Sequence, residues 1–172
     1  MIKTSLIVLV TLMASTSVYA QAPAAAPAPP PPRAKGPAVA LAVEAAQSAL
    51  ADCMSKTYKV TALVVDSAGV LVAMMSQDGA AVRTQDVAKS KIATVMKYKV
   101  ASGVIVERAK TDTALADALK ADPAIGQARQ GALPIIVKGE MVGAMAVSGA
   151  PGGDKDEACV MTGLAKVQAR LM

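Results

Sequence analysis

The sequence predicts an α+β domain, in which helices pack against one antiparallel sheet, preceded by an export signal and a proline-rich tether. Two strand pairs with short polar turns are separated by helical stretches, which favours antiparallel pairing. The regular alternation of strand and helix that a doubly wound parallel sheet requires is absent. The sequence also contains no internal repeat.

Residues 1–20 have the three parts of a cleavable signal peptide in the expected order. Lys3 supplies a positive charge, residues 6–14 are largely apolar, and a more polar stretch ends at Ala20 with residues that suit signal peptidase. The apolar run is well short of the ~20 residues of a membrane span. We therefore expect cleavage near Ala20, a periplasmic or extracellular location, and no transmembrane segment in the mature chain. The alternative is an uncleaved N-terminal anchor.

Residues 21–37 form the predicted tether. They contain seven of the ten prolines, spaced mostly by alanine. This composition favours an extended, semi-rigid polyproline II spacer, which we expect to be disordered relative to the domain. The domain is then expected to cover residues 38–172, which is long enough to bury one core of its own.

The domain is predicted to open with a helix and a hairpin. Apolar residues at helical spacing support a helix over roughly residues 38–56. Strand-like runs follow at 59–65 and 70–76, and the polar, glycine-ended stretch 66–69 between them favours a turn.

The middle of the domain is predicted to be helical. After a break at residues 78–79, Thr84 is placed to cap a helix over about 85–99. A weaker helix is predicted over 112–121, and it stops at an Asp-Pro pair. The pattern of residues 101–110 fits no single element.

A second strand pair and a final helix complete the domain. The predicted strands cover 135–138 and 141–147, with a turn at a glycine between them. The glycine-rich stretch 149–153 then breaks the chain. Asp154 and Glu157 have the spacing of a capping box, which predicts that the last helix starts at Asp154.

The composition excludes several kinds of site. The chain has no His, so it lacks the usual general base near neutral pH and the commonest metal ligand. Two cysteines cannot build a Cys/His zinc site, and triads that use a histidine base are excluded. Loss of Lys3 would leave a net charge of +4, one less than the +5 of the full chain. With almost no aromatic residues to stack on bases, we do not expect a nucleic-acid partner.

Several short motifs follow one another through the domain: Val64-Val65-Asp66, Asp78-Gly79-Ala80, Lys91 to Thr94, Gly131 to Pro134, and the longest, Val147 to Ala158. In this order they resemble the GlcG/HbpS-like proteins, which include the C-terminal domain of PduO. The resemblance covers roughly residues 38–170, and the last motif is its most specific part.

The resemblance implies a PAS/profilin-like fold, an antiparallel sheet with helices packed against it, and a homo-oligomer. It also implies a ligand, because some members of the family bind haem or take part in haem, iron or corrinoid handling. The chain departs from the family pattern at Ser76, Arg83, Ala132 and Ala146. These positions lie in the expected ligand region, so the identity of the ligand does not carry over.

Lys91 is the most suggestive single residue. On a helical wheel it falls between Val87 and Val95, inside the apolar stripe of the second helix. A charge there is costly unless it is paired or reaches water. One interpretation of Lys91 is a pocket lysine that holds a carboxylate, such as a haem propionate or a small acid. The alternatives are a snorkelling side chain or a structural ion pair with an aspartate such as Asp66.

The expected ligand face lies between the second helix and the second hairpin. The candidate ligand-binding residues are Arg83, Lys91, Thr94, Tyr98, Gly131, Pro134, Ser148 and Gly149. Haem is the most specific candidate ligand. Because there is no histidine, its iron would need a residue such as Tyr98, Thr94, Met74 or Met75, and tyrosine ligation has precedent. No Phe or Trp is present to stack on the macrocycle.

Cys53 and Cys159 are the only cysteines, and they fall in the first and last predicted helices. In an exported protein they form either a disulfide or two buried thiols. The sequence leaves both states open.

We predict an exported binding protein that takes up a small acidic molecule or haem. One alternative is an enzyme of the isomerase or lyase type acting on a small carboxylated substrate, with Lys91 and Arg83 orienting the acid. No second catalytic group in the sequence is paired with Lys91. The other alternative is a structural oligomer without a ligand.

Overall fold

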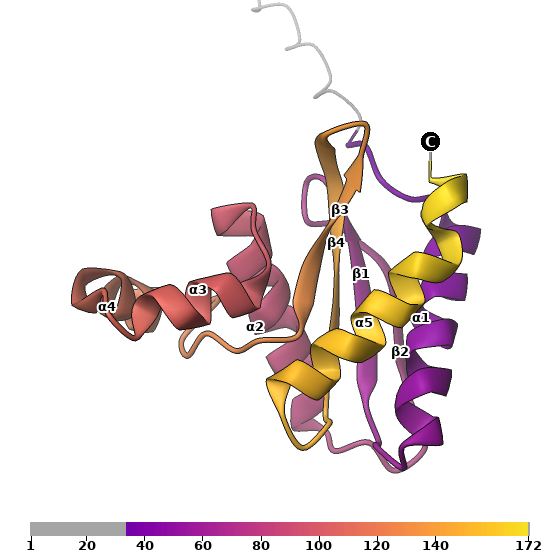
Figure 1. The fold of residues 1–172 in the computed structure, drawn as a ribbon, viewed down its shortest axis with the longest axis horizontal. Coiled ribbons are helices and arrows are strands. Elements are labelled where there is room, and N and C mark those ends of the chain that lie inside the picture. Colours follow the sequence, from indigo (N-terminus) through magenta and orange to yellow (C-terminus); the bar gives the residue numbers. More distant parts are fainter. Residues whose placement is uncertain (1–33, 172) are drawn as a thin grey trace, which may run out of the picture. The chain divides into compact units, whose positions relative to one another are not determined.

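The structure, a computed structural model, describes residues 34–171. The predicted signal peptide and most of the predicted tether lie outside these residues. Among the residues described, no helix is long and apolar enough to cross a bilayer. The predicted α+β fold is confirmed, with helices on both faces of a four-stranded antiparallel sheet (Figure 1).

The elements follow the predicted order, with one additional helix and a short 3-10 turn. They are α1 (Val39–Ser55), β1 (Thr61–Asp66), β2 (Leu71–Ser76), α2 (Arg83–Tyr98), α3 (Ser102–Ala109), α4 (Thr113–Ala121), β3 (Ala132–Val137), β4 (Glu140–Ser148), α5 (Gly153–Val167) and η1 (Gln168–Arg170). The strand order in the sheet is β2-β1-β4-β3. The two hairpins therefore meet at the β1–β4 pair, in which Thr61 lies opposite Ser148.

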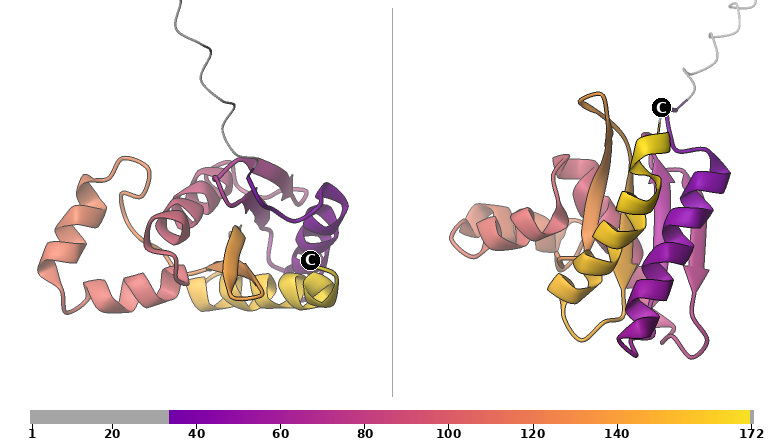
Figure 2. Two further views of the ribbon diagram at one scale, coloured as in Figure 1. Left: turned by 90° about the horizontal axis from the view of Figure 1, so that it is seen from above. Right: turned by 45° about the vertical axis from the view of Figure 1, so that its right-hand side comes forward.

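The two faces of the sheet are covered by different helices. α1 and α5 lie side by side on one face, as both views of Figure 2 show, over a core that includes Ala46, Val64 and Val160. α2 covers the other face, where Ile92 packs in one cluster with Ala144. The central strands β1 and β4 are therefore buried on both sides, which fixes the end of β4 firmly in place.

The ambiguous stretch 101–110 contains α3. With α4, this helix extends away from the sheet (Figure 1). The two helices enclose a small third cluster of Ile105, Leu119 and Ile125. The apolar positions were too few for an unambiguous period, because α3 has only two buried residues, one of them a serine.

The start of α2 differs from the prediction. The helix begins at Arg83, so Thr84 lies in its first turn and is not the cap. The hydroxyl of Thr84 donates to the carbonyl oxygen of Ala81 at 2.7 Å and lies 2.7 Å from Oγ1 of Thr61 in β1. Thr84 therefore fastens the helix to the sheet.

The predicted capping box of α5 is also wrong. The helix begins at Gly153, one residue before Asp154, and no side chain caps Gly152. Instead, the carboxylate of Asp156 accepts a hydrogen bond from the backbone N–H of Ala150 at 2.9 Å. This bond closes the loop between β4 and α5 and places Asp156 beneath it.

A disulfide joins Cys53 of α1 to Cys159 of α5. Of the two states that the sequence left open, the structure has the bond. Both residues are fully buried, and the bond closes a loop with a sequence separation of 106 residues. It ties together the two helices that cover the same face of the sheet.

The last residues of the predicted tether contact the domain. The backbone N–H of Lys35 donates to Oγ of Ser67 at 2.8 Å, and the N–H of Ser67 donates to the carbonyl oxygen of Lys35 at 2.7 Å. Nζ of Lys35 also pairs with Glu140 at 2.6 Å. These contacts place the start of the described chain at the end of the sheet opposite the β4–α5 loop (Figure 1).

Candidate functional site

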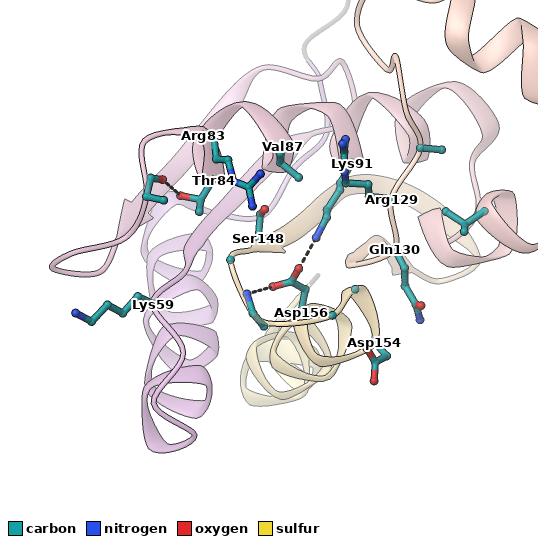
Figure 3. A pocket seen from close by; sticks show the side chains of 17 residues that line it. Lys59, Arg83, Thr84, Val87, Lys91, Arg129, Gln130, Ser148, Asp154 and Asp156 are labelled. Atoms are coloured by element: carbon teal, nitrogen blue, oxygen red, sulfur yellow. Dashed lines mark hydrogen bonds and ion pairs between the residues drawn. The ribbon is translucent and has the colours of Figure 1, made fainter.

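A pocket of about 480 Å³ opens where β4 ends and where α2 and α5 begin (Figure 3). Its walls come from the first turns of α2, the β4–α5 loop and the segment before β3. We call it the arginine pocket, after Arg83 and Arg129. Its other polar lining residues are Lys59, Thr84, Lys91, Gln130, Ser148, Asp154 and Asp156.

A buried ion pair forms the floor of the arginine pocket. Nζ of Lys91 donates to the carboxylate of Asp156 at 2.6 Å and to the carbonyl oxygen of Val147 at 2.8 Å. The side chains of Lys91 and Asp156 are only 2% and 6% exposed. The lysine inside the apolar stripe of α2 is thus compensated from α5, on the far side of β4.

Burial governs the charges of this pair. It lowers the pKa of Lys91, which the carboxylate of Asp156 opposes, and it raises the pKa of Asp156, which the ammonium of Lys91 opposes. Lys91 therefore already holds a carboxylate of its own protein. The predicted structural ion pair is present with a different partner, since Asp66 instead accepts the backbone N–H groups of Ala68 and Val70 in its turn.

Gly131 packs directly against the pair. Its backbone has φ of +118°, and a Cβ there would lie 2.6 Å from Nζ of Lys91 and 2.7 Å from Cβ of Asp156. Only glycine fits this position without moving the ion pair. The absence of a side chain at Gly131 therefore leaves the room that the ion pair occupies.

Ser148 presents an unused hydroxyl to the arginine pocket. The residue is 4% exposed and is the last residue of β4. Its hydroxyl forms no hydrogen bond to any group of residues 34–171, and Figure 3 shows it on the side of the Arg83 guanidinium. The hydroxyl oxygen itself reaches the pocket surface, because among the described residues the only fully buried side-chain oxygen or nitrogen without a partner is Oε2 of Glu157. The hydroxyl can therefore donate a hydrogen bond to a ligand in the pocket.

The rim of the pocket is positively charged. Arg83 and Lys59 are exposed, and within the described part of the chain neither forms an ion pair. Arg129 is steadied by Gln127, to whose Oε1 it donates at 2.7 Å. Because the buried pair cancels itself, these three cations face one free carboxylate, Asp154. The local net charge of +2 favours an anionic ligand.

The structure brings together only some of the predicted ligand residues. Those in or against the arginine pocket are Arg83, Lys91, Ser148, Gly149 and Gly131. Three others lie elsewhere: Thr94, Tyr98 and Pro134.

Thr94 is fully buried, and its hydroxyl donates to the carbonyl oxygen of Ser90 at 3.0 Å, so it does not face the pocket. Tyr98 packs at the other end of α2 against the third cluster. Pro134 lies within the edge strand β3, where a missing N–H is tolerated. Met74 and Met75 of β2 pack against the two main cores.

Sequence reasoning did not assign Asp156, Lys59 or Arg129 to the site. Asp156 had a usable signal, because it continues the buried face of α5 at helical spacing before Cys159 and Gly163. Arg129 lies on a connecting segment, where no periodicity marks the direction of its side chain. Lys59 falls at the start of the predicted strand 59–65 but precedes β1 in the structure.

Comparisons with known proteins agree with this fold. Residues 38–165 match the family described as haem degrading protein HbpS-like. A double mutant of HbpS from Streptomyces reticuli is 28% identical, with a TM-score of 0.71 over 86% of this chain and 98% of that one. No curated protein matches the chain.

Two more distant structures share the fold. The Klebsiella pneumoniae protein ORFY is 20% identical, with a TM-score of 0.71 over 84% of this chain and 99% of that one. PduOC, solved as a complex with heme, is 16% identical, with a TM-score of 0.69 over 76% of this chain and 94% of that one. At these identities the similarity shows a common fold only.

Proposed function

Because the chain belongs to the HbpS-like family of haem degrading proteins, we propose that it is a binding protein that holds carboxylate groups in the arginine pocket. Haem, which carries two propionate carboxylates, is the first ligand to test. The observation that carries this proposal is the unpartnered hydroxyl of Ser148, which lines a positively charged pocket on the side of Arg83.

The carboxylate is best accommodated at the Arg83 end of the pocket. A guanidinium can donate two parallel hydrogen bonds to a carboxylate, and the Ser148 hydroxyl supplies a third donor nearby. The first turn of α5 also lines the pocket, but the N–H groups of Lys155 and Asp156 already donate to the carbonyl oxygen of Gly152, so the positive charge comes from the side chains of the rim. Figure 3 shows Asp154 on the far side from Arg83, so its charge orients an acidic ligand toward Arg83.

The arginine pocket fits the propionates of haem but not its iron. Its lining contains no Tyr, Met or Cys, and the chain has no His. The hydroxyl of Thr84 is already used within the protein. The pocket would therefore bind and orient the acidic edge of haem, and the iron would need a donor from outside it.

We also propose that the protein is exported. Residues 1–20 have the composition of a signal peptide, and the Cys53–Cys159 disulfide suits an oxidising compartment. The homo-oligomer implied by the family stays a prediction. The enzyme alternative is less well supported, because the ammonium group of Lys91 faces Asp156 and Val147.

Calorimetric titration with iron-free protoporphyrin IX tests the proposal, because this molecule carries the propionates without the metal. We expect binding to the purified protein to weaken about 10- to 100-fold in Arg83→Gln and about tenfold in Ser148→Ala, the range for hydrogen bonds to charged groups. Arg108→Gln is the matched control, since Arg108 is an exposed arginine outside the arginine pocket.

Two results would contradict the proposal. One is unchanged binding in both pocket variants. The other is an equal loss in Arg108→Gln, which would mean that net charge, and not the pocket, attracts the ligand.

A further inference from the structure

A second pocket of about 480 Å³ adjoins the arginine pocket, because Lys59 lines both. We call it the tyrosine pocket. Its lining residues are Met54, Thr57, Tyr58, Lys59, Ser76, Gln77 and Asp78. Two pockets of different chemistry therefore meet at one side chain.

The tyrosine pocket offers a thioether and a phenol. The side chain of Met54 is 63% exposed, so its thioether is accessible from solvent. The hydroxyl of Tyr58 forms no hydrogen bond within the described chain. Gln77, in contrast, is fully used, since it donates to Leu50 O and accepts from Val60 N, both at 2.8 Å.

The backbone that presents Tyr58 is in an unusual conformation. Thr57 has φ of +65°, a left-handed value that a β-branched residue rarely adopts. The turn is held by hydrogen bonds from Thr57 N to Met54 O at 2.8 Å and from Tyr58 N to Cys53 O at 3.0 Å. Cys53 is itself fixed by the disulfide. Such strain persists where the surroundings impose it, often at ligand sites.

We propose that Tyr58 is the axial iron ligand of a haem that lies across both pockets. The macrocycle would cover Met54 and Tyr58, and its propionates would extend past Lys59 toward Arg83. The inference rests on the proposed function, because it takes haem as the ligand. On coordination, the phenol oxygen of Tyr58 bonds to ferric iron and releases its proton to solvent, without any change of oxidation state.

The charges around Tyr58 suit a phenolate. Nζ of Lys155 lies 5.8 Å from the centroid of its ring, and Lys59 follows it in the chain. The ammonium group of Lys155 over the ring favours the negative charge that the phenol acquires on coordination. The lining also contains the carboxylate of Asp78, whose negative charge favours a ferric centre.

The other iron donors of the described residues are less suitable. The two cysteines are joined in the disulfide. Tyr98 packs against the α3–α4 cluster and lines neither pocket. Met145 is fully buried, and Met54, which lines the same pocket as Tyr58, offers a neutral thioether, a weaker donor to ferric iron than an anionic phenolate oxygen. Tyr58 is thus the strongest donor at a pocket that adjoins cations for propionates.

Haemin titration with absorption and resonance Raman spectroscopy tests the inference. We expect the purified protein to show phenolate charge-transfer absorption and an iron–phenolate stretch. Both should be absent in Tyr58→Phe, with haemin affinity weaker by about tenfold or more. Tyr98→Phe is the matched control and should give the same spectra as the unaltered protein.

Phenolate signals that survive in Tyr58→Phe, or that never form in the unaltered protein, would overturn the inference. Iron-free protoporphyrin IX separates this failure from that of the proposed function. If Tyr58 acts through iron, Tyr58→Phe should bind the iron-free molecule within about twofold of the unaltered protein, whereas Arg83→Gln should bind it weakly. If Tyr58→Phe lost affinity equally for haemin and for iron-free protoporphyrin IX, the result would contradict iron ligation and indicate that Tyr58 only packs against the porphyrin.

Discussion

Replacing Lys91 by Met should strongly destabilise the domain. The substitution keeps most of the side-chain volume but leaves the carboxylate of Asp156, which is 6% exposed, with only the backbone N–H of Ala150 as partner. Removal of one member of a buried ion pair costs about 3–5 kcal/mol. For a domain of this size that corresponds to a fall in Tm of roughly 10–20 °C. Thermal unfolding followed by circular dichroism at neutral pH measures it.

Two further variants make this experiment decisive. Lys97→Met removes a surface ion pair with Asp122, and because such pairs contribute little to stability, its Tm should stay close to that of the unaltered protein. The double variant Lys91→Met/Asp156→Leu removes both buried charges and should recover most of the lost stability. Two results would refute the buried pair. One is a Tm of Lys91→Met equal to that of Lys97→Met. The other is a double variant less stable than Lys91→Met alone.

Three other predictions concern the same domain. Reduction of the Cys53–Cys159 bond should lower the free energy of unfolding by about 3–5 kcal/mol, measured in denaturant with and without reductant; equal midpoints would contradict it. The pKa of Asp122 is lowered by its hydrogen bond from Lys97, so its contribution to stability is present above its usual pKa and is lost as pH falls through the folded value. Carboxyl NMR should show this pKa rising toward its usual value in Lys97→Met, and no change would exclude the pairing. Gly131→Ala should lower Tm by several degrees because of its positive φ and the contact with the buried lysine, and an unchanged melting curve would rule out that contact.

The sequence predicted the elements that have a clear period or a clear turn. Both hairpins and the helices α1, α2, α4 and α5 lie where the patterns placed them, within a few residues. The helix starts were wrong at Thr84 and Asp154 because polar residues at capping positions have other partners. The hydroxyl of Thr84 bonds to Thr61 of β1. At the start of α5, Asp156 bonds to the backbone of the β4–α5 loop, whereas the capping box had predicted this for Asp154 and Glu157.

The site was predictable only in part, for a physical reason. Lys91 could be recognised as anomalous from its place in an apolar stripe, and Ser148 and Gly149 from their motif. The partner of Lys91 could not be chosen, because the choice depends on how α5 crosses the end of β4. Tyr58 was not singled out, since its place in a pocket depends on the left-handed turn at Thr57.

Ligand-induced shifts of backbone amide resonances test the central claim, that carboxylates bind in the arginine pocket, most directly. Titration with iron-free protoporphyrin IX should shift the amides of residues 148–150, 152 and 153 and of the first turn of α2, and leave those of α4 in place. At a ligand concentration near the dissociation constant of the unaltered protein, Arg83→Gln should show much smaller shifts. Shifts confined to other surfaces, or shifts that persist unchanged in Arg83→Gln, would contradict it.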